Sequence, residues 1–299
     1  MDGYKQIIKS QKTRMAILKF LSFVPDAMMI KTQYRIKLKR KLNLKNPQRY
    51  TEKMQWYKLY YRDPVMTTCV DKYSVRQYVK DRIGDSFLTK LYQVCSAPEE
   101  ISFEQLPEKF IIKTTNGSGT NIICTDKSKL DRHAVINTLT EYMSRPAISA
   151  GREWAYNNVK NRIVVEELLE DPNNRYGGVN DYKLMCFSGK VYCIVVDVAR
   201  FTNHKRNFYT PDWKRIDAVS DHDNFEPDID APTGLAKMIQ IAEKLSAPFP
   251  HVRVDLYSVS GHIYFGELTF YPWSGYVQYT PDQFDFDLGK EFELRPFQK

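Results

Sequence analysis

One lysine lies inside an apolar run that leads into a glycine-bearing turn. The run is Phe110-Ile-Ile-Lys113, and Gly117 and Gly119 follow it closely. An ammonium group among apolar side chains loses solvation free energy unless an anion lies nearby. Glycine lets backbone N–H groups approach such an anion. The segment from Phe110 to Cys124 therefore predicts a phosphate-binding hairpin, and a nucleoside triphosphate is the first ligand to consider.

A second hairpin, near the end of the chain, carries carboxylates. Its predicted parts are strands at 251–257 and 262–269 and a loop at 259–261. A three-residue loop would set position 253 opposite 267 and position 255 opposite 265, so that Arg253, Asp255, Glu267 and Thr269 share one face. Carboxylates about 7–8 Å apart on that face can hold one or two Mg²⁺ ions. Two alternatives stay open: Arg253 pairs with Glu267 on an exposed face, or a two-residue loop puts Asp255 and Glu267 on opposite faces.

The elements around these hairpins predict an α+β fold. Residues 1–60 lack strand alternation and predict helices broken near Pro25 and Pro47. Further expected elements are helices at 71–84, 131–143 and 233–246, a strand at 162–169, and a hairpin at 182–198. Gly84 is expected to end the first of these helices, and Thr233 to cap the last. Because hairpins outnumber β-α-β units, we expect largely antiparallel sheets with helices on one side.

The charge of the chain is unevenly distributed. The net charge is +8, but residues 1–60 carry 15 Lys or Arg against three acids, which leaves the remaining residues net acidic. This distribution argues against a nucleic-acid enzyme, whose positive charge would line its working surface. It favours a basic N-terminal arm that contacts anionic lipid or another polyanion, or alternatively a solvated helical surface.

Several sequence features indicate a cytoplasmic protein that is at most peripheral to a membrane. The apolar stretch 16–30 is interrupted by Lys19, Pro25 and Asp26, so it is too broken to span a bilayer. No small-residue cleavage site follows it. The five cysteines form no C-x-x-C pair, which fits reduced thiols in or near the core. The five histidines show no metal-ligand spacing, so a zinc site is not expected.

The order of the motifs resembles that of ATP-grasp enzymes. The matching segments are Asp71-Lys72, Phe110-Ile-Ile-Lys113 with Asn116-Gly-Ser-Gly119, Val165-Glu-Glu-Leu-Leu169, Arg253-Val-Asp255 and Glu267-Leu-Thr269. The phrases Leu44-Lys-Asn-Pro-Gln-Arg-Tyr-Thr-Glu-Lys-Met-Gln-Trp-Tyr57 and Asp181-Tyr-Lys-Leu-Met-Cys-Phe-Ser-Gly-Lys190 narrow the resemblance to the TupA-like branch, named for teichuronopeptide synthesis. The resemblance covers roughly residues 42 to 276.

This resemblance implies an ATP-grasp fold with an added basic helical segment. The implied parts are the N-terminal segment at 1–65, a first lobe with the glycine-rich loop at 66–165, and a second lobe with the adenine hinge and metal site at 166–299. ATP would lie between the two lobes. Its phosphates would meet Lys72, Lys113 and the loop residues Asn116, Gly117, Ser118, Gly119 and Thr120. Its adenine would meet the hinge of Glu166, Glu167, Leu168 and Leu169.

The resemblance also implies a magnesium site and a reaction class. Asp255 and Glu267 would ligate Mg²⁺, Arg253 would stabilise the transferred phosphoryl group, and Thr269 stands where the family usually has asparagine. The associated chemistry is carboxylate–amine ligation through an acyl phosphate. Charge neutralisation and in-line positioning supply most of the rate in such chemistry, so a site rich in cations and poor in nucleophiles fits it. The expected substrates are a hexuronic acid of a bacterial surface polysaccharide and an amino acid or amine.

Other residues leave alternatives open. Asp181 could reach the ribose and Lys183 a phosphate or uronate, or they are a turn-capping aspartate and a surface lysine. A sugar-and-carboxylate surface is a further hypothesis, built from Arg200, Lys205, Arg206, Trp213 and Trp273. Asp221-His-Asp223 or Asp228-Ile-Asp230 could be the D-x-D motif of a metal-dependent glycosyltransferase, although turn chemistry explains both. A phosphotransferase would use the same nucleotide site on a hydroxyl group.

Overall fold

A computed structural model of the chain describes residues 20–115, 119–144, 151–172, 174, 176, 178–199 and 202–295. Asn116, Gly117, Ser118, Arg200 and residues 1–19 lie outside these ranges, so the predictions made for them stay predictions. The α-helices are α3 (Asp26–Leu38), α4 (Tyr50–Tyr60), α5 (Val65–Val70), α6 (Val75–Ile83), α7 (Arg132–Ser144), α8 (Leu235–Ser246) and α9 (Gln283–Glu291). The strands are β1 (Leu91–Cys95), β2 (Phe110–Thr114), β3 (Asn121–Cys124), β4 (Ile163–Glu166), β5 (Asp181–Phe187), β6 (Lys190–Val198), β7 (Lys205–Tyr209), β8 (Arg215–Ile216), β9 (His251–Val259) and β10 (His262–Thr269). Short 3-10 turns include η6 (Pro272–Gly275).

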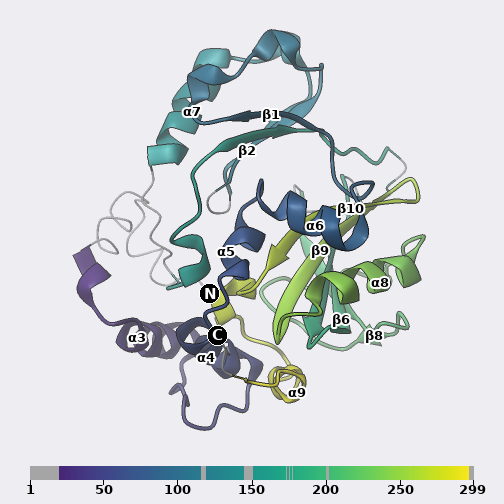
Figure 1. The fold of residues 1–299 in the computed structure, drawn as a ribbon. Helices are drawn as coiled ribbons and strands as arrows, with labels where there is room; N and C mark the ends of the chain where they lie inside the picture. The colour runs from purple at the N-terminus through teal and green to yellow at the C-terminus, as the bar shows by residue number, and fades with distance from the viewer. Residues whose placement is uncertain are drawn as a thin grey trace.

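The smaller sheet has four antiparallel strands in the order β1-β4-β2-β3, and α7 covers one of its faces (Figure 1). Strand β2 alternates in burial, so Phe110 and Ile112 pack into the core under α7. Side chains alternate between the two faces along a strand. Ile111 pairs with Glu166, and Lys113 lies two residues after Ile111, so Lys113 and Glu166 share the face opposite to that of Phe110 and Ile112. The face away from α7 therefore carries the charges.

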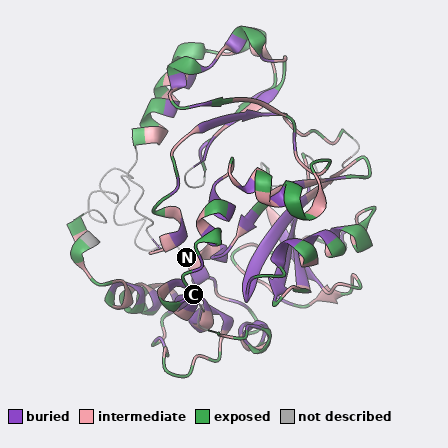
Figure 2. Cartoon of the chain, in the orientation of Figure 1, coloured by how far each residue is buried: buried purple, intermediate pink, exposed green. Residues whose placement is uncertain are grey.

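The larger sheet has six antiparallel strands in the order β10-β9-β5-β6-β7-β8. Its strands are largely buried (Figure 2). Helix α8 packs on one face, where the Cys186 thiol approaches the Ala242 carbonyl. Helix α4 packs on the other face through Tyr50, which contacts His251 and Phe187. The expected antiparallel pairing is confirmed. The expectation that helices cover only one side was wrong for this sheet, because both of its faces carry apolar residues.

Helix α4 docks through an apolar stripe and is fixed at its start by hydrogen bonds. Tyr50, Met54 and Tyr57 recur at helical spacing and are fully buried. The Glu52 carboxylate accepts hydrogen bonds from the backbone N–H groups just before the helix. Thr51 donates its N–H and hydroxyl to Asp285 of α9. Polar residues of the segment 44–57 thus fix the position of α4.

The β9–β10 hairpin differs from the predicted register. His262 pairs with Val259, so the loop is the two-residue Ser260-Gly261 and not a three-residue loop. A bulge at Gly266 then shifts the pairing by one residue, which sets Glu267 opposite Asp255 and Thr269 opposite Arg253. The expected cross-strand pairs were wrong. The bulge nevertheless returns all four side chains to a common face, because it restores the parity that the shorter loop removes.

Helix α8 begins differently from the prediction. It starts at Leu235, and its N-cap is Gly234 in the left-handed conformation at a φ of 86°, with no side-chain cap. The expected Thr233 cap is therefore wrong, since glycine adopts this conformation without the cost of a Cβ. Helix α6 ends before Gly84 at a φ of 93°, as expected. The five cysteines are buried free thiols, which confirms the core assignment. None of the described helices is long and apolar enough to cross a membrane.

Candidate functional site

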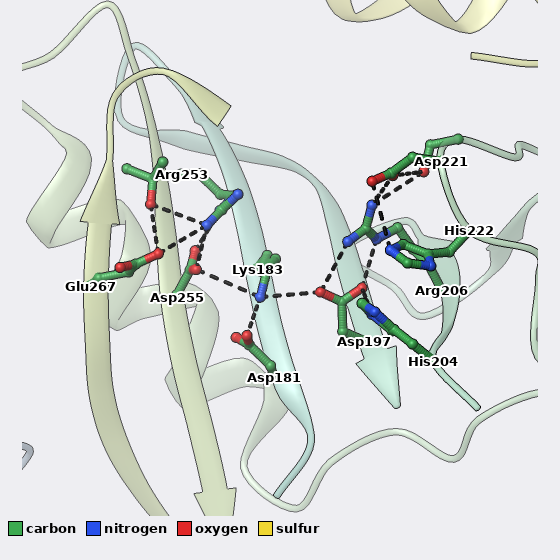
Figure 3. A network of polar contacts seen from close by, with 12 residues as sticks. Asp181, Lys183, Asp197, His204, Arg206, Asp221, His222, Arg253, Asp255 and Glu267 are labelled. Carbon is green, nitrogen blue, oxygen red and sulfur yellow. Dashed lines mark hydrogen bonds and ion pairs between the residues drawn. The ribbon is translucent and has the colours of Figure 1, made fainter. Parts of the chain in front are cut away.

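Charged side chains of β10, β9, β5, β6 and β7 form a continuous network across the larger sheet (Figure 3). The strand register sets Glu267 opposite Asp255, Asp255 opposite Lys183, and Asp197 opposite both Asp181 and Arg206. Apart from Glu267, these residues are all buried. A buried charge is stable only when it is paired and hydrogen-bonded. The adjacency of the strands therefore accounts for charges that would otherwise be costly inside a sheet.

The guanidinium of Arg253 gathers the three oxygen groups that were expected to bind metal. Its Nη2 lies 2.6 Å from Asp255 Oδ2, 3.2 Å from Glu267 Oε1 and 3.1 Å from Thr269 Oγ1. Its Nε donates a second bond of 2.6 Å to Asp255 Oδ1, which makes the aspartate pairing bidentate. One cationic nitrogen is thus surrounded by two carboxylates and a hydroxyl.

The two carboxylates beside Arg253 have different electrostatic environments. Burial raises the pKa of Asp255, while Arg253 and Lys183 lower it. Burial also raises the pKa of Glu267, but Arg253, Lys72 and Lys183 outweigh it and bring that pKa down to about 2. About half of the Glu267 side chain is exposed, whereas Asp255 is enclosed. Glu267 is therefore ionised at neutral pH and accessible to a ligand.

Lys183 lies in the middle of the network. Its ammonium contacts Asp181 and lies 3.3 Å from Asp197 Oδ2 and 3.7 Å from Asp255 Oδ2. The alternatives of a surface lysine and a turn-capping aspartate were wrong, because Lys183 and Asp181 are both buried within β5. Lys183 thus links the Asp255 side of the network to the Asp197 side.

Arg206 extends the network towards Asp221, in the segment after β8, and towards the ring of Trp273. It forms a bidentate pair with Asp197 and an ion pair with Asp221. Its guanidinium carbon lies 4.8 Å from the centre of the Trp273 ring, and that of Arg253 lies 5.3 Å from the same ring. Asp223 pairs with Lys205 at 3.1 Å. Both carboxylates of the first D-x-D candidate are thus occupied by cations of β7.

Lys113 of β2 and Arg76 of α6 both pair with the carboxylate of Glu166 in the smaller sheet. Lys113 Nζ lies 2.8 Å from Glu166 Oε2, and Arg76 Nη1 lies 2.8 Å from Glu166 Oε1. Arg76 also donates to the Thr89 carbonyl, which fixes its direction. About a quarter of the Lys113 side chain is exposed. The expected counter-anion of Lys113 is therefore supplied by the protein itself in this structure, with one edge of the ammonium still accessible.

Lys72 connects the charges of the two sheets. Burial lowers its pKa, the nearby carboxylates of Glu267 and Glu166 raise it, and Lys113 lowers it. Its turn is held by Asp71, which accepts backbone N–H bonds from the turn and pairs with Arg162 Nη2 at 2.7 Å. The ammonium thus lies within electrostatic reach of the β10 carboxylate and of the Lys113–Glu166 pair.

The glycine loop and the hinge are partly described. Gly119 has a φ of 71°, and the Thr120 hydroxyl lies 2.8 Å from that of Thr114, so this side chain closes the base of the loop. After β4 the chain leaves the sheet, and the Glu167 N–H donates to the Lys90 carbonyl. Glu167, Leu168 and Leu169 are half-buried in this irregular stretch.

The sequence also matches a known family. Residues 52–293 match the family described as TupA-like ATPgrasp. The chain belongs to this family. The resemblance inferred from the motifs is thereby confirmed, and with it the α+β ATP-grasp fold of the TupA-like chain. No match was found among curated protein sequences.

Solved structures with a similar fold have low identity to this TupA-like chain. The D-alanine–D-alanine ligase of Helicobacter pylori has a TM-score of 0.46 at 15% identity, and the match covers 81% of this chain and 68% of that one. The L-amino acid ligase of Bacillus licheniformis has a TM-score of 0.45 at 13% identity, with 98% and 64% covered. The D-alanine–D-alanine ligase of Bacillus anthracis, solved with ATP, has a TM-score of 0.40 at 14% identity, with 68% and 54% covered. The chain thus spans about half the length of that last enzyme.

Two members of the site were missed from the sequence. Asp197 lies within the apolar run Ile194-Val-Val-Asp-Val198, so the argument used for Lys113 would have found it. Arg76 lies on a helix among other charged residues and gave no signal. It takes part only because α6 packs beside the end of β4, which brings its guanidinium to Glu166. Contacts of that kind depend on tertiary structure.

Proposed function

We propose that this protein is an ATP-dependent carboxylate–amine ligase. The observation that carries the proposal is the position of the turn that holds Lys72, between α5 and α6: α5 packs against β10 of the larger sheet, and Arg76 of α6 pairs with Glu166 of the smaller one. A polyphosphate that meets Lys72 can reach cations of the smaller sheet and acidic groups of the larger one together. That combination is what a nucleotide–metal complex requires.

In this proposal ATP binds through both sheets. Lys113 and Lys72 contact its phosphates, with the loop 116–120 beside them. An arriving phosphate would take Lys113 from Glu166, which keeps Arg76 as its partner and so does not become an unpaired buried charge. The Glu167 N–H already donates to the Lys90 carbonyl. We therefore assign one adenine contact to the Glu167 carbonyl and a second adenine contact to the main chain of Leu169.

The residues around Arg253 fit a magnesium ion by their chemistry. Carboxylate and hydroxyl oxygens are hard donors, and Mg²⁺ is commonly held by one or two carboxylates together with substrate phosphates. The ion-paired network contains the carboxylates of Asp181, Asp197, Asp221, Asp255 and Glu267 and the cations Lys183, Arg206 and Arg253, which is an excess of two negative charges when the histidines are neutral. Within the described residues no group of three or more His, Cys, Asp or Glu could hold a metal ion, so in this proposal phosphate oxygens and water would supply most of the coordination. When bound, Mg²⁺ would neutralise charge on the phosphates.

The reaction has two displacement steps. A substrate carboxylate oxygen attacks the γ-phosphorus of ATP, ADP leaves, and an acyl phosphate forms. The amine nitrogen then attacks the acyl carbon, and phosphate leaves as the amide forms. Arg253 and Lys113 stabilise the negative charge that develops on the transferred phosphoryl group, because cations positioned beside the phosphates favour the more highly charged transition state.

We further propose a hexuronic acid of a bacterial surface polysaccharide as the carboxylate, and an amino acid or amine as the second substrate. Support comes from Arg206 and Arg253, which lie against the Trp273 ring where a sugar face and a carboxylate would meet. Trp213 is a weaker candidate, because its ring stacks on Tyr209 with centroids 4.5 Å apart. Asp181 and Lys183 act at a distance, by holding Asp255 and Asp197 in place.

The test of the ligase proposal is the product. ATP or ADP with Mg²⁺ should raise the melting temperature, whereas UDP-sugars should do little; the opposite order would favour a metal-dependent glycosyltransferase. When hydroxylamine replaces the amine in the presence of uronic acids, an acyl phosphate gives a hydroxamate. ATP consumption with a phosphorylated hydroxyl product and no hydroxamate would instead identify a phosphotransferase.

A further inference from the structure

Helix α3 presents a single outward face that mixes cations with apolar side chains. The exposed residues recur at helical spacing and are Met28, Lys31, Thr32, Arg35, Ile36 and Lys39, which we call the α3 face. The inward residues Ile30, Tyr34 and Leu38 pack against α4 and Tyr276, so the orientation of the helix is fixed. The α3 face therefore stays in solvent while the opposite side holds the helix on the body.

Large exposed apolar side chains are concentrated at this end of the molecule. Phe20 and Phe23 are each 74% exposed, Met28 is 60% exposed and Ile36 is 52% exposed. These four are within seventeen consecutive residues, yet they are four of the nine large exposed apolar residues in the part of the chain that the structure describes. Phe20 and Phe23 contact each other edge to face with centroids 5.9 Å apart. Large exposed apolar side chains gathered along one short segment indicate an interaction surface.

The charge beside this cluster is of one sign. Lys31, Arg35, Lys41 and Lys45 line a hollow of about 830 Å³ between α3 and the following loop. Acids nearby are engaged with other groups. Asp26 pairs with Arg152, Glu52 accepts backbone N–H bonds at the start of α4, and Asp282 and Asp285 pair with Arg40 and Arg49. The surface is thus strongly cationic, whereas the chain after residue 60 is net acidic.

We propose that the α3 face and the Phe20–Phe23 pair bind the surface of a bilayer that contains anionic lipid. The cations would meet lipid phosphates at the headgroup level, and the four apolar side chains would enter the boundary with the acyl chains. A soluble polyanion or a nucleic acid would account for the cations but would leave Met28 and Ile36 in water. The bilayer is the partner that uses both kinds of side chain.

The test is binding of the full-length protein to sedimented vesicles. Phosphatidylcholine vesicles are compared with vesicles that contain about 30% phosphatidylglycerol, at about 50 and 300 mM NaCl. We expect at least about 100-fold tighter binding to the anionic vesicles, weakened at high salt. Equal binding to both lipids, or no binding to either, would overturn the proposal.

Matched charge variants locate the surface. K31E/R35E/K41E should weaken binding to anionic vesicles more than about 100-fold, since each cation near such a surface contributes about fivefold. The control K129E/K214E/K244E makes the same change of net charge at exposed lysines on other elements and should stay within about threefold of wild type. Equal losses in the two variants would contradict a local surface. If the first variant fails to fold, the neutral K31Q/K41Q replaces it.

The apolar residues separate a bilayer from a soluble polyanion. F20S/F23S should bind anionic vesicles about tenfold more weakly and dextran sulfate equally well, because only a bilayer receives the rings. If F20S/F23S binds vesicles like wild type, or if duplex DNA binds the wild-type protein more tightly than anionic vesicles do, the bilayer is the wrong partner. None of these measurements uses ligase turnover, so they do not depend on the proposed function.

Discussion

Glu267 lies directly opposite Asp255 in the β9–β10 ladder, and Gly266 is the residue that makes this possible. The two-residue loop at Ser260-Gly261 by itself would send the two carboxylates to opposite faces of the sheet. The bulge at Gly266 reverses that parity just before Glu267. A Cβ added to Gly266 would lie 3.0 Å from the Asp255 carbonyl oxygen, so an alanine there would require the backbone at Asp255 to move by a few tenths of an ångström.

Replacement of Gly266 by alanine should therefore damage the site more than the fold. The crowding predicts a loss of about 1–3 kcal/mol in the free energy of unfolding. Turnover should fall more than tenfold, because the Glu267–Asp255 register shifts. Gly261→Ala is the control: its φ of 83° costs a similar free energy, but it leaves the register at Glu267 unchanged. Equal turnover in the two variants at equal stability would show that the bulge does not serve the reaction.

Glu267→Gln should reduce turnover with little loss of stability. The change removes one negative charge from a half-exposed side chain but keeps its size, so we expect a loss of about 10²–10³ in kcat and a higher Mg²⁺ requirement. Initial rates measured over a range of Mg²⁺ concentrations check this. Asp223→Asn, which removes an exposed carboxylate paired with Lys205, is the matched control and should behave like wild type. A Glu267→Gln enzyme with normal rates would exclude the proposed metal site.

Lys113→Ala should weaken ATP binding. A hydrogen bond to a charged group contributes about 1.5–3 kcal/mol, so the dissociation constant should rise by roughly 10- to 150-fold. Isothermal titration with a non-hydrolysable ATP analogue measures the effect. Lys109→Ala removes a similar lysine that pairs with Glu170 near the start of the same strand and should change nothing. Unchanged affinity in the Lys113 variant would remove Lys113 from the nucleotide site.

His251 should make the fold sensitive to acid. It is fully buried, its Nδ1 bonds the Cys186 carbonyl, and burial lowers its pKa to about 3. In the unfolded chain the imidazole titrates near its ordinary pKa of about 6.5. Below that pH the unfolded state binds a proton that the folded state does not, so stability falls as the pH decreases towards 3. The expected loss is about 2 kcal/mol between pH 7 and 5.

Urea unfolding at several pH values tests this dependence. The variant His251→Asn should be less stable than wild type at pH 7. Its free energy of unfolding should, however, fall less than that of wild type between pH 7 and 5. A pH slope that is the same in both proteins would show that other groups cause the acid sensitivity.

Lys58 should hold the turn that carries Trp273. Its buried ammonium donates to the Gly151 and Ser274 carbonyls at 2.8 and 2.9 Å, and Trp273 and Ser274 both have positive φ values. Burial lowers the pKa of Lys58 to about 7. Lys58→Met removes both bonds, and although Gln55 Nε2 still donates to the Ser274 carbonyl at 3.2 Å, the Gly151 carbonyl loses this donor. We therefore expect a loss of about 1–3 kcal/mol in stability and altered tryptophan emission.

The control for Lys58 lies on the same helix. Lys53→Met removes an ammonium that donates to the Phe292 carbonyl at 2.8 Å, away from the Trp273 turn. It should lower stability without changing the emission. If both variants change the emission equally, the turn does not depend on Lys58.

The sequence predicted much of the architecture because local patterns carry it. Their positions inside apolar runs marked Lys113 and the Arg253–Asp255 pair as candidate site residues. Apolar periodicity, glycine positions and motif order indicated the hairpins and the ATP-grasp resemblance. These features depend on neighbours in the chain, so they can be read from the sequence alone.

Tertiary structure decided which charges meet. The pairing of Lys183 with Asp197 depends on β6 lying beside β5, and that of Arg76 with Glu166 depends on where α6 packs. The β9–β10 register depended on two opposing one-residue shifts, at the loop and at Gly266, neither of which the alternation of side chains reveals. Local patterns determine which face a side chain takes within its own element, whereas the identity of its partners is set by how separate elements pack, and only the folded chain contains that information.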